Sequence, residues 1–149
     1  MVIRLASLLL ATAGTFAAAP AAAQFAKTED AISYRQSAMF IQGQHFGRIA
    51  AMANGRAPFD AASAAANADI VAGMSKLPWP AFGAGTEGGK ARPEIWKEQA
   101  KFKELSEKLQ AETDKLQTVA KGGNLEAIKA QVGAVGQTCK ACHDDFRKK

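Results

Sequence analysis

Apolar residues recur along this chain at alternating spacings of three and four positions, which is the pattern of helices with one buried face. Four stretches show this pattern, at residues 29–54, 61–76, 93–121 and 125–146. None of them shows the strict two-residue alternation of a half-buried strand. The first and third connections are short and the second is long. The sequence therefore predicts an all-α fold, an antiparallel four-helix bundle.

Capping and turn residues mark the ends of the same stretches. Asp60 and Asn124 are suitable N-caps for the second and fourth helices, because their side chains accept hydrogen bonds from free backbone N–H groups. Pro78 ends the second helix, and Pro93 suits the first turn of the third. Gly55 suits the position just after the first helix. Local signals and hydrophobic pattern thus place the connections at the same points.

The last stretch carries the only two cysteines of the chain on its apolar face. Its stripe runs unbroken at three- and four-residue spacing through Leu125, Ile128, Val132, Val135, Cys139, Cys142 and Phe146. Cys139 and Cys142 are followed directly by His143, which gives the C-x-x-C-H spacing of c-type haem attachment. Two thiols form thioethers with the haem vinyl groups, and the imidazole binds the iron. On a helix the three side chains face one side of the ring. We expect one covalently attached haem c per chain, inside the core, with His143 as the metal ligand.

Other uses of the C-x-x-C-H motif fit less well. A structural zinc site takes four ligands, and the chain offers only His45 besides the three residues of the motif. A redox dithiol is typically accompanied by a βαβ pattern, and no such pattern surrounds this motif. A disulfide between the two thiols is the remaining alternative. Haem attachment therefore accounts best for the motif.

The long connection, residues 77–92, contains four glycines and two large aromatic residues, Trp79 and Phe82. A loop of this length in a compact domain is often functional. We expect both aromatic side chains to cover the end of the core. The alternative is that Phe82 helps to wall the haem pocket.

The first 23 residues read as a secretory signal peptide. Arg4 precedes an apolar run at residues 5–19, and small residues at 21–23 offer a cleavage site after Ala23. Export agrees with the haem motif, because covalent attachment of this kind takes place outside the bacterial cytoplasm. We expect residues 24–149 to form one domain in the periplasm. No other segment approaches the length of a membrane span, so the mature chain is not expected to insert into a membrane.

The chain is basic, with a formal net charge of +5. A basic stripe with interleaved aromatic residues is missing, which argues against a nucleic-acid partner. Three cations close the sequence at residues 147–149. They suit the negative end of the last helix dipole, and the alternative is that they steer an acidic periplasmic redox partner.

The whole of residues 24–149 resembles cytochrome c′, the class II family of c-type cytochromes. The haem motif is common to all c-type cytochromes, whereas its late position and the first-helix and loop motifs are specific to this class. The matching segments are 24–27 (QFAK), 34–38 (YRQSA), 45–48 (HFGR), 77–79 (LPW), 81–83 (AFG), 85–89 (GTEGG), 92–96 (RPEIW), 135–136 (VG) and 139–147 (CKACHDDFR).

The resemblance implies a four-helix bundle that forms a homodimer through its first two helices. It implies His143 as the proximal ligand of a high-spin, five-coordinate iron, with Met39 as the bulky apolar residue on the distal side. Members of the family bind nitric oxide and carbon monoxide and discriminate against dioxygen. The roles proposed for them are sequestration of nitric oxide and periplasmic electron transfer.

Further residues match family positions near the haem. Arg35 and Gln36 match positions at the haem edge, where the resemblance implies that Arg35 meets a propionate. Thr86 and Glu87 match loop positions close to the haem, and Arg147 lies one turn beyond His143, beside the proximal face. His45 lies off the apolar stripe and is expected to be an ordinary helix residue.

Three functions are compatible with the sequence. The first is a gas-binding haem protein with an open iron site. The second is an electron carrier in which Met39 is the sixth ligand, since methionine sulfur is a ligand that haem iron accepts. An enzyme such as a peroxidase would need distal acid–base groups, and the first-helix stripe offers only Arg35. We therefore expect a protein that is not an enzyme.

Overall fold

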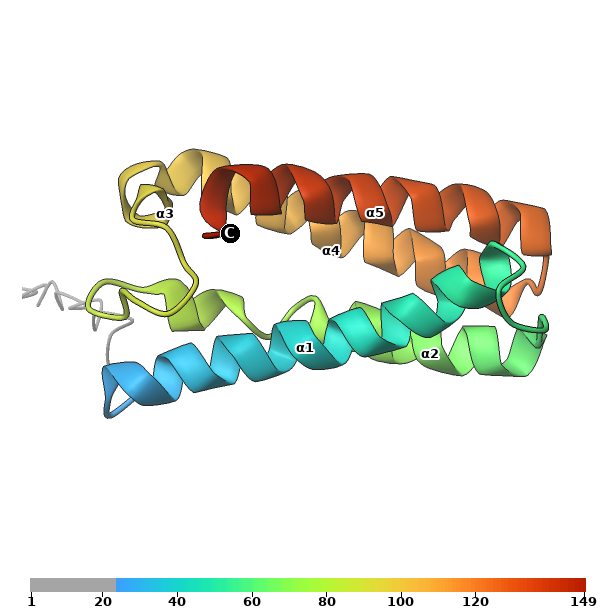
Figure 1. The fold of residues 1–149 in the computed structure, drawn as a ribbon, viewed down its shortest axis with the longest axis horizontal. Coiled ribbons are helices and arrows are strands. Elements are labelled where there is room, and N and C mark those ends of the chain that lie inside the picture. The colour runs from blue at the N-terminus through green and yellow to red at the C-terminus, as the bar shows by residue number, and fades with distance from the viewer. Residues whose placement is uncertain (1–23) are drawn as a thin grey trace, which may run out of the picture.

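The computed structural model describes residues 24–149, and the predicted signal peptide, 1–23, lies outside the described residues. Four long helices run side by side and successively reverse direction (Figure 1): α1 (Thr28–Ala53), α2 (Ala61–Met74), α4 (Gln99–Lys121) and α5 (Leu125–Phe146). Between residues 24 and 149 there is no strand, only an isolated bridge between Ala91 and Arg147. The predicted all-α antiparallel bundle is confirmed. No helix in the described part of the chain is long and apolar enough to cross a membrane.

The sequence predicts the third helix as one unit that starts at residue 93, but the structure divides this segment into two helices. A short helix, α3 (Glu94–Lys97), is separated from α4 by Glu98, whose backbone leaves helical geometry. The cause is contact with the long loop, because the Trp96 indole N–H donates to the Gly83 carbonyl at 2.9 Å. Ile95 is buried beside it. These anchors fix the direction of α3, so that the chain bends before α4 begins.

The long loop is also more ordered than its glycine content suggests. A single 3₁₀ turn, η2 (Trp79–Phe82), occupies its start, with Pro80 inside that turn. The helix α2 ends at Met74, before the predicted residue 76 and four residues before Pro78, and Pro78 and Pro80 fix φ at two positions of the turn that follows. As a result, Trp79 and Phe82 belong to a regular turn, which fixes the backbone from which their side chains project.

The best-packed part of the core lies toward the end of the bundle where α1 turns into α2 and α4 turns into α5 (Figure 1). Ile49, Leu116 and Ile128 are at most 1% exposed there. Ala64 and Ala68 of α2 are fully buried, and their small side chains let neighbouring helices approach closely. Two side-chain caps match the predictions. Asp60 accepts a hydrogen bond from the Ser63 N–H, and Asn124 accepts one from the Ala127 N–H.

Polar side-chain contacts also join α2 to its neighbours α1 and α4. His45 Nδ1 lies 2.7 Å from the Asn67 side-chain oxygen, which links α1 to α2. The Thr113 hydroxyl donates to the Ser75 hydroxyl at 2.9 Å, and both residues are fully buried. Because each buried hydroxyl is paired, this contact between α2 and α4 avoids the cost of an unsatisfied polar group.

Candidate haem site

A cavity of about 520 Å³ lies between α1 and α5. It is at the end of the bundle where these two helices are farthest apart and where the long loop crosses (Figure 1). Of the ten site residues predicted from the sequence, eight line this cavity: Arg35, Gln36, Met39, Phe82, Cys139, Cys142, His143 and Arg147. The other two, Thr86 and Glu87, lie in the loop beside it. The structure thus brings most of the predicted site together.

The helical spacing of α5 presents its three haem-binding groups to the cavity. Cys139, Cys142 and His143 all lie within the uninterrupted helix and all line the cavity wall. Both cysteines are free thiols. Buried Val135 and Phe146 continue the same stripe on either side. Packing of the apolar stripe against the bundle therefore turns the motif inward.

The surroundings keep these groups neutral. Burial raises the pKa of the Cys139 thiol, and burial together with Cys139 and Asp145 raises the pKa of Cys142 to about 11. Desolvation, followed by the charge of Arg147, lowers the pKa of His143. A neutral imidazole has the free lone pair that a metal ligand needs.

Apolar and aromatic side chains form the rest of the wall. Phe102 contacts Phe82 and Phe146 edge-on, with ring centroids 4.9 and 5.3 Å apart. Trp79 stands next to Phe82 and Phe102. The Phe82 ring packs in the aromatic cluster and also lines the cavity. Its contact with haem stays a prediction.

Arg35 fastens the long loop to α1. Its guanidinium group donates to the carbonyls of Ala81, Thr86 and Gly88 at 2.6, 2.7 and 3.0 Å, and its side chain is 3% exposed. The group also lies 4.6 Å from the centre of the Phe82 ring. Burial lowers the pKa of Arg35, an effect that Glu87 opposes, but a guanidinium remains charged at neutral pH. A contact with a haem propionate, which stays a prediction, would use its remaining N–H groups.

Thr86 and Glu87 shape the loop. The Thr86 hydroxyl donates to the Gly83 carbonyl at 2.7 Å, and Glu87 accepts a bond from the Gly85 N–H. Gly89 follows with a φ of +57°, and an added Cβ there would stand 2.9 Å from the Gln36 amide nitrogen. Glycine is needed at this point because the loop backbone lies directly against α1.

The segment after α5 pairs with the loop. The Lys148 N–H donates to the Lys90 carbonyl at 2.9 Å, and the Arg92 N–H donates to the Phe146 carbonyl at 3.0 Å. This pairing places Lys90 beside Arg147 on the cavity wall. The loop is therefore attached to α1 on one side and to the end of α5 on the other.

Sequence reasoning missed two polar residues of the cavity. Lys90 lies in the loop, and only its pairing with the segment after α5 brings it to the site. Gln42 lines the cavity and is 6% exposed. The sequence did contain a signal for Gln42, because it lies on the apolar stripe of α1 with Met39 and Phe46. A polar residue on a buried stripe is unusual and indicates a specific role.

The residues present fit haem c. Apolar and aromatic walls suit the ring, and two thiols and an imidazole from α5 suit its attachment and ligation. The cations Arg35, Lys90 and Arg147 suit its two carboxylates.

Comparisons with known proteins agree with this site. A family model described as Cytochrome C' matches residues 30–147. A cytochrome c′ of Alcaligenes xylosoxydans xylosoxydans is 51% identical over 126 residues, which cover 85% of this chain and 99% of the relative. One from Rubrivivax gelatinosus is 50% identical over 129 residues and covers 85% of this chain and 100% of the relative.

Among solved structures, a nitric oxide complex of a mutant cytochrome c prime from Alcaligenes xylosoxidans has a TM-score of 0.81 at 50% identity. The match covers 85% of this chain and 100% of that chain. The fold, the haem motif and these similarities lead to one conclusion. This chain belongs to the cytochrome c′ family, whose members bind haem c covalently.

Proposed function

We propose that this protein is a periplasmic haem c protein with a high-spin, five-coordinate iron, which binds nitric oxide or carbon monoxide, carries electrons, or does both. The observation that carries the proposal is the cavity between α1 and α5. His143 lines it from α5, and Met39 lines it from α1. A solved relative bears nitric oxide, which supports a gaseous ligand. In this proposal the protein binds ligands or carries electrons and is not an enzyme.

Bound haem c supplies an iron that accepts diatomic ligands and exchanges one electron. Cys139 and Cys142 would hold the group covalently to α5, and His143 would offer its neutral imidazole to the iron. Met39, on α1, gives the facing side an apolar surface. Arg35 and Gln36 lie close to the propionates in this proposal, and Arg147 lies beside His143. The aromatic cluster around Phe102 gives the site an apolar wall.

A second function rests on Met39 itself. Its thioether lines the cavity from the helix that faces His143, and haem iron accepts a methionine sulfur. If Met39 is the sixth ligand, the iron is low-spin and the protein is a class II electron carrier for periplasmic redox partners.

An optical spectrum of the reduced holoprotein, recorded with and without nitric oxide or carbon monoxide, tests the proposal. We expect a high-spin ferrous spectrum and a new absorption band with each gas. A low-spin spectrum that neither gas changes would favour the electron carrier.

Export is part of the proposal. We expect the haem-stained protein in the periplasmic fraction, with a mass that corresponds to a start at Gln24. Haem protein retained in the cytoplasm at full length would contradict it.

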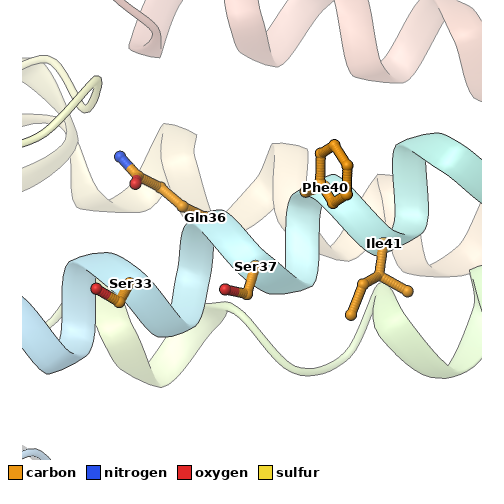
Figure 2. A pocket seen from close by; sticks show the side chains of 5 residues that line it. All are labelled: Ser33, Gln36, Ser37, Phe40 and Ile41. Carbon is orange, nitrogen blue, oxygen red and sulfur yellow. The ribbon is translucent and has the colours of Figure 1, made fainter.

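We further propose that two copies pair through α1 and α2. Ile41 of α1 is 40% exposed, and Ile70 of α2 is 37% exposed. Figure 2 shows Ile41 pointing away from α5, whereas Phe40 points toward it. Analytical ultracentrifugation of Ile41→Asp and wild type tests this. We expect a dimer for wild type and a larger monomer fraction for the variant, and a wild-type monomer would contradict it.

A further inference from the structure

Gln42 is a buried polar residue on the α1 wall of the haem cavity. It lies on α1, three residues after Met39, so that both side chains stand on one face of the helix. It lines the cavity and is 6% exposed. Its neighbours on the wall include Phe46 and Val71. The amide offers two N–H donors and an acceptor oxygen in otherwise apolar surroundings.

The other polar side chains on the cavity wall are either engaged or exposed. The Trp79 indole N–H donates to the Ser75 carbonyl at 2.6 Å, and Arg35 is engaged by the loop carbonyls. Gln36, Lys90, His143 and Arg147 are exposed. Within residues 24–149, no hydrogen bond joins the Gln42 side chain to another residue. The amide atoms are still reached by solvent, and Gln42 lines the cavity, so its N–H groups are available to a ligand on the cavity side.

We propose that the side-chain amide of Gln42 donates a hydrogen bond to a small ligand held in the cavity on the α1 side, and that it favours ligands bearing negative charge. This inference rests on the proposed ligand-binding function. A donor at Gln42 would favour charged ligands over neutral ones, whereas a wholly apolar distal side would offer no such donor. A donor in a site of low dielectric constant strengthens binding of a charged acceptor much more than that of a weakly polar one.

Gln42→Met tests the donor in the holoprotein, because methionine keeps the length of the side chain and removes both N–H groups. Gln44→Met is the matched control, since Gln44 is an exposed glutamine on the same helix, outside the cavity. The probes are cyanide for the ferric protein and carbon monoxide for the ferrous protein. Cyanide is an anion when bound, whereas carbon monoxide is neutral and weakly polar.

We expect Gln42→Met to weaken cyanide binding about tenfold, the change expected for loss of a hydrogen bond to a charged group. Carbon monoxide affinity should change less than about twofold, because a weakly polar acceptor gains little from a donor. The C–O stretching frequency should rise, because the donor no longer polarises the bound molecule. Gln44→Met should reproduce wild type in all three measurements.

The ligand-free holoprotein gives a further readout. Gln42→Met should raise its thermal midpoint, because an apolar side chain replaces an amide on an otherwise apolar wall. Equal loss of cyanide and carbon monoxide affinity, with an unchanged C–O stretch, would overturn the inference and leave the proposed function standing. Failure of the wild type to bind cyanide and carbon monoxide would overturn both the inference and the gas-binding part of the proposed function, and would leave electron transfer.

Discussion

At the end of the bundle that holds the two short turns, Ile49, Leu116 and Ile128 are almost completely buried, and apolar side chains fill the space between the helices. At the other end, α1 and α5 border a cavity whose wall includes the thiols of α5 and the buried amide of Gln42. The same four helices thus have a packed end and a cavity end.

The difference shows where stability and function lie in this protein. The packed end buries side chains against one another and has no chemical groups for a cofactor. The cavity end depends on haem to complete its core and on the long loop to close its side. Substitutions at the packed end should therefore change stability and leave the haem spectrum intact, whereas substitutions at the cavity end should change haem retention, spectrum or ligand binding.

The largest effect is expected from replacing both cysteines by alanine. Cys139→Ala or Cys142→Ala alone should weaken covalent retention of haem, and the double variant should abolish it, because no thioether remains. The double variant should also have a much lower thermal midpoint, because a cavity of haem size cannot collapse fully. Haem staining after denaturing electrophoresis measures retention, and full staining of the double variant would refute the haem c assignment.

At the packed end, Leu116→Ala should lower the free energy of unfolding by about 2–5 kcal/mol, the usual cost of a cavity in a core. The control is Leu77→Ala, because Leu77 is 39% exposed and should cost less than about 1 kcal/mol. Denaturant unfolding measures both. The haem spectrum should stay unchanged in both variants. An altered spectrum in Leu116→Ala would contradict the separation of stability and haem binding between the two ends.

Alkaline pH should destabilise the haem-free protein through its thiols. The pKa of Cys142 is raised in the folded state to about 11 from an ordinary value of 9.0. The folded chain therefore holds this proton more tightly, and the stabilisation is present below pH 9 and lost as pH rises toward 11. Its size is up to about 2 kcal/mol after allowance for partial exposure.

Thermal unfolding of the haem-free protein between pH 8 and 11 measures this effect. The variant with alanine at both positions, Cys139→Ala and Cys142→Ala, is the control, because it has no thiols to ionise. The two proteins should diverge above pH 9, with the thiol-bearing chain losing more stability. Parallel curves would show that the buried thiols do not cause the loss.

The smallest effect is expected at the cap of α2, at the packed end. Asp60→Ala removes the oxygen that accepts from the Ser63 N–H and should cost about 1 kcal/mol. Asp60→Asn keeps a cap oxygen and should cost much less. Equal losses in both variants, measured by denaturant unfolding, would mean that the charge and not the cap carries the effect.

The two ends were also unequally predictable from sequence. Hydrophobic periodicity and capping residues gave all four long helices, and the stripe through Cys139 and Cys142 placed the thiols toward the core. These features depend on residues that are neighbours along one helix. For the same reason, the caps at Asp60 and Asn124 were predictable.

Contacts between distant segments were not predictable in this way. Arg35 binds loop carbonyls 46 to 53 residues away, and Lys90 reaches the cavity through pairing with Lys148. The break at Glu98 follows from the bond between Trp96 and Gly83. Periodicity describes which face of a helix is buried, but it does not describe what the loop brings to that face.

In the function we propose, the iron is five-coordinate, with Met39 as an apolar cover on the α1 side. Optical and magnetic circular dichroism spectra of ferrous wild type and Met39→Ala at neutral pH test it most directly. We predict high-spin spectra for both proteins and faster carbon monoxide binding in the variant, because removal of the side chain clears the path to the iron. A low-spin wild type that becomes high-spin only in Met39→Ala would contradict the account and make Met39 a ligand.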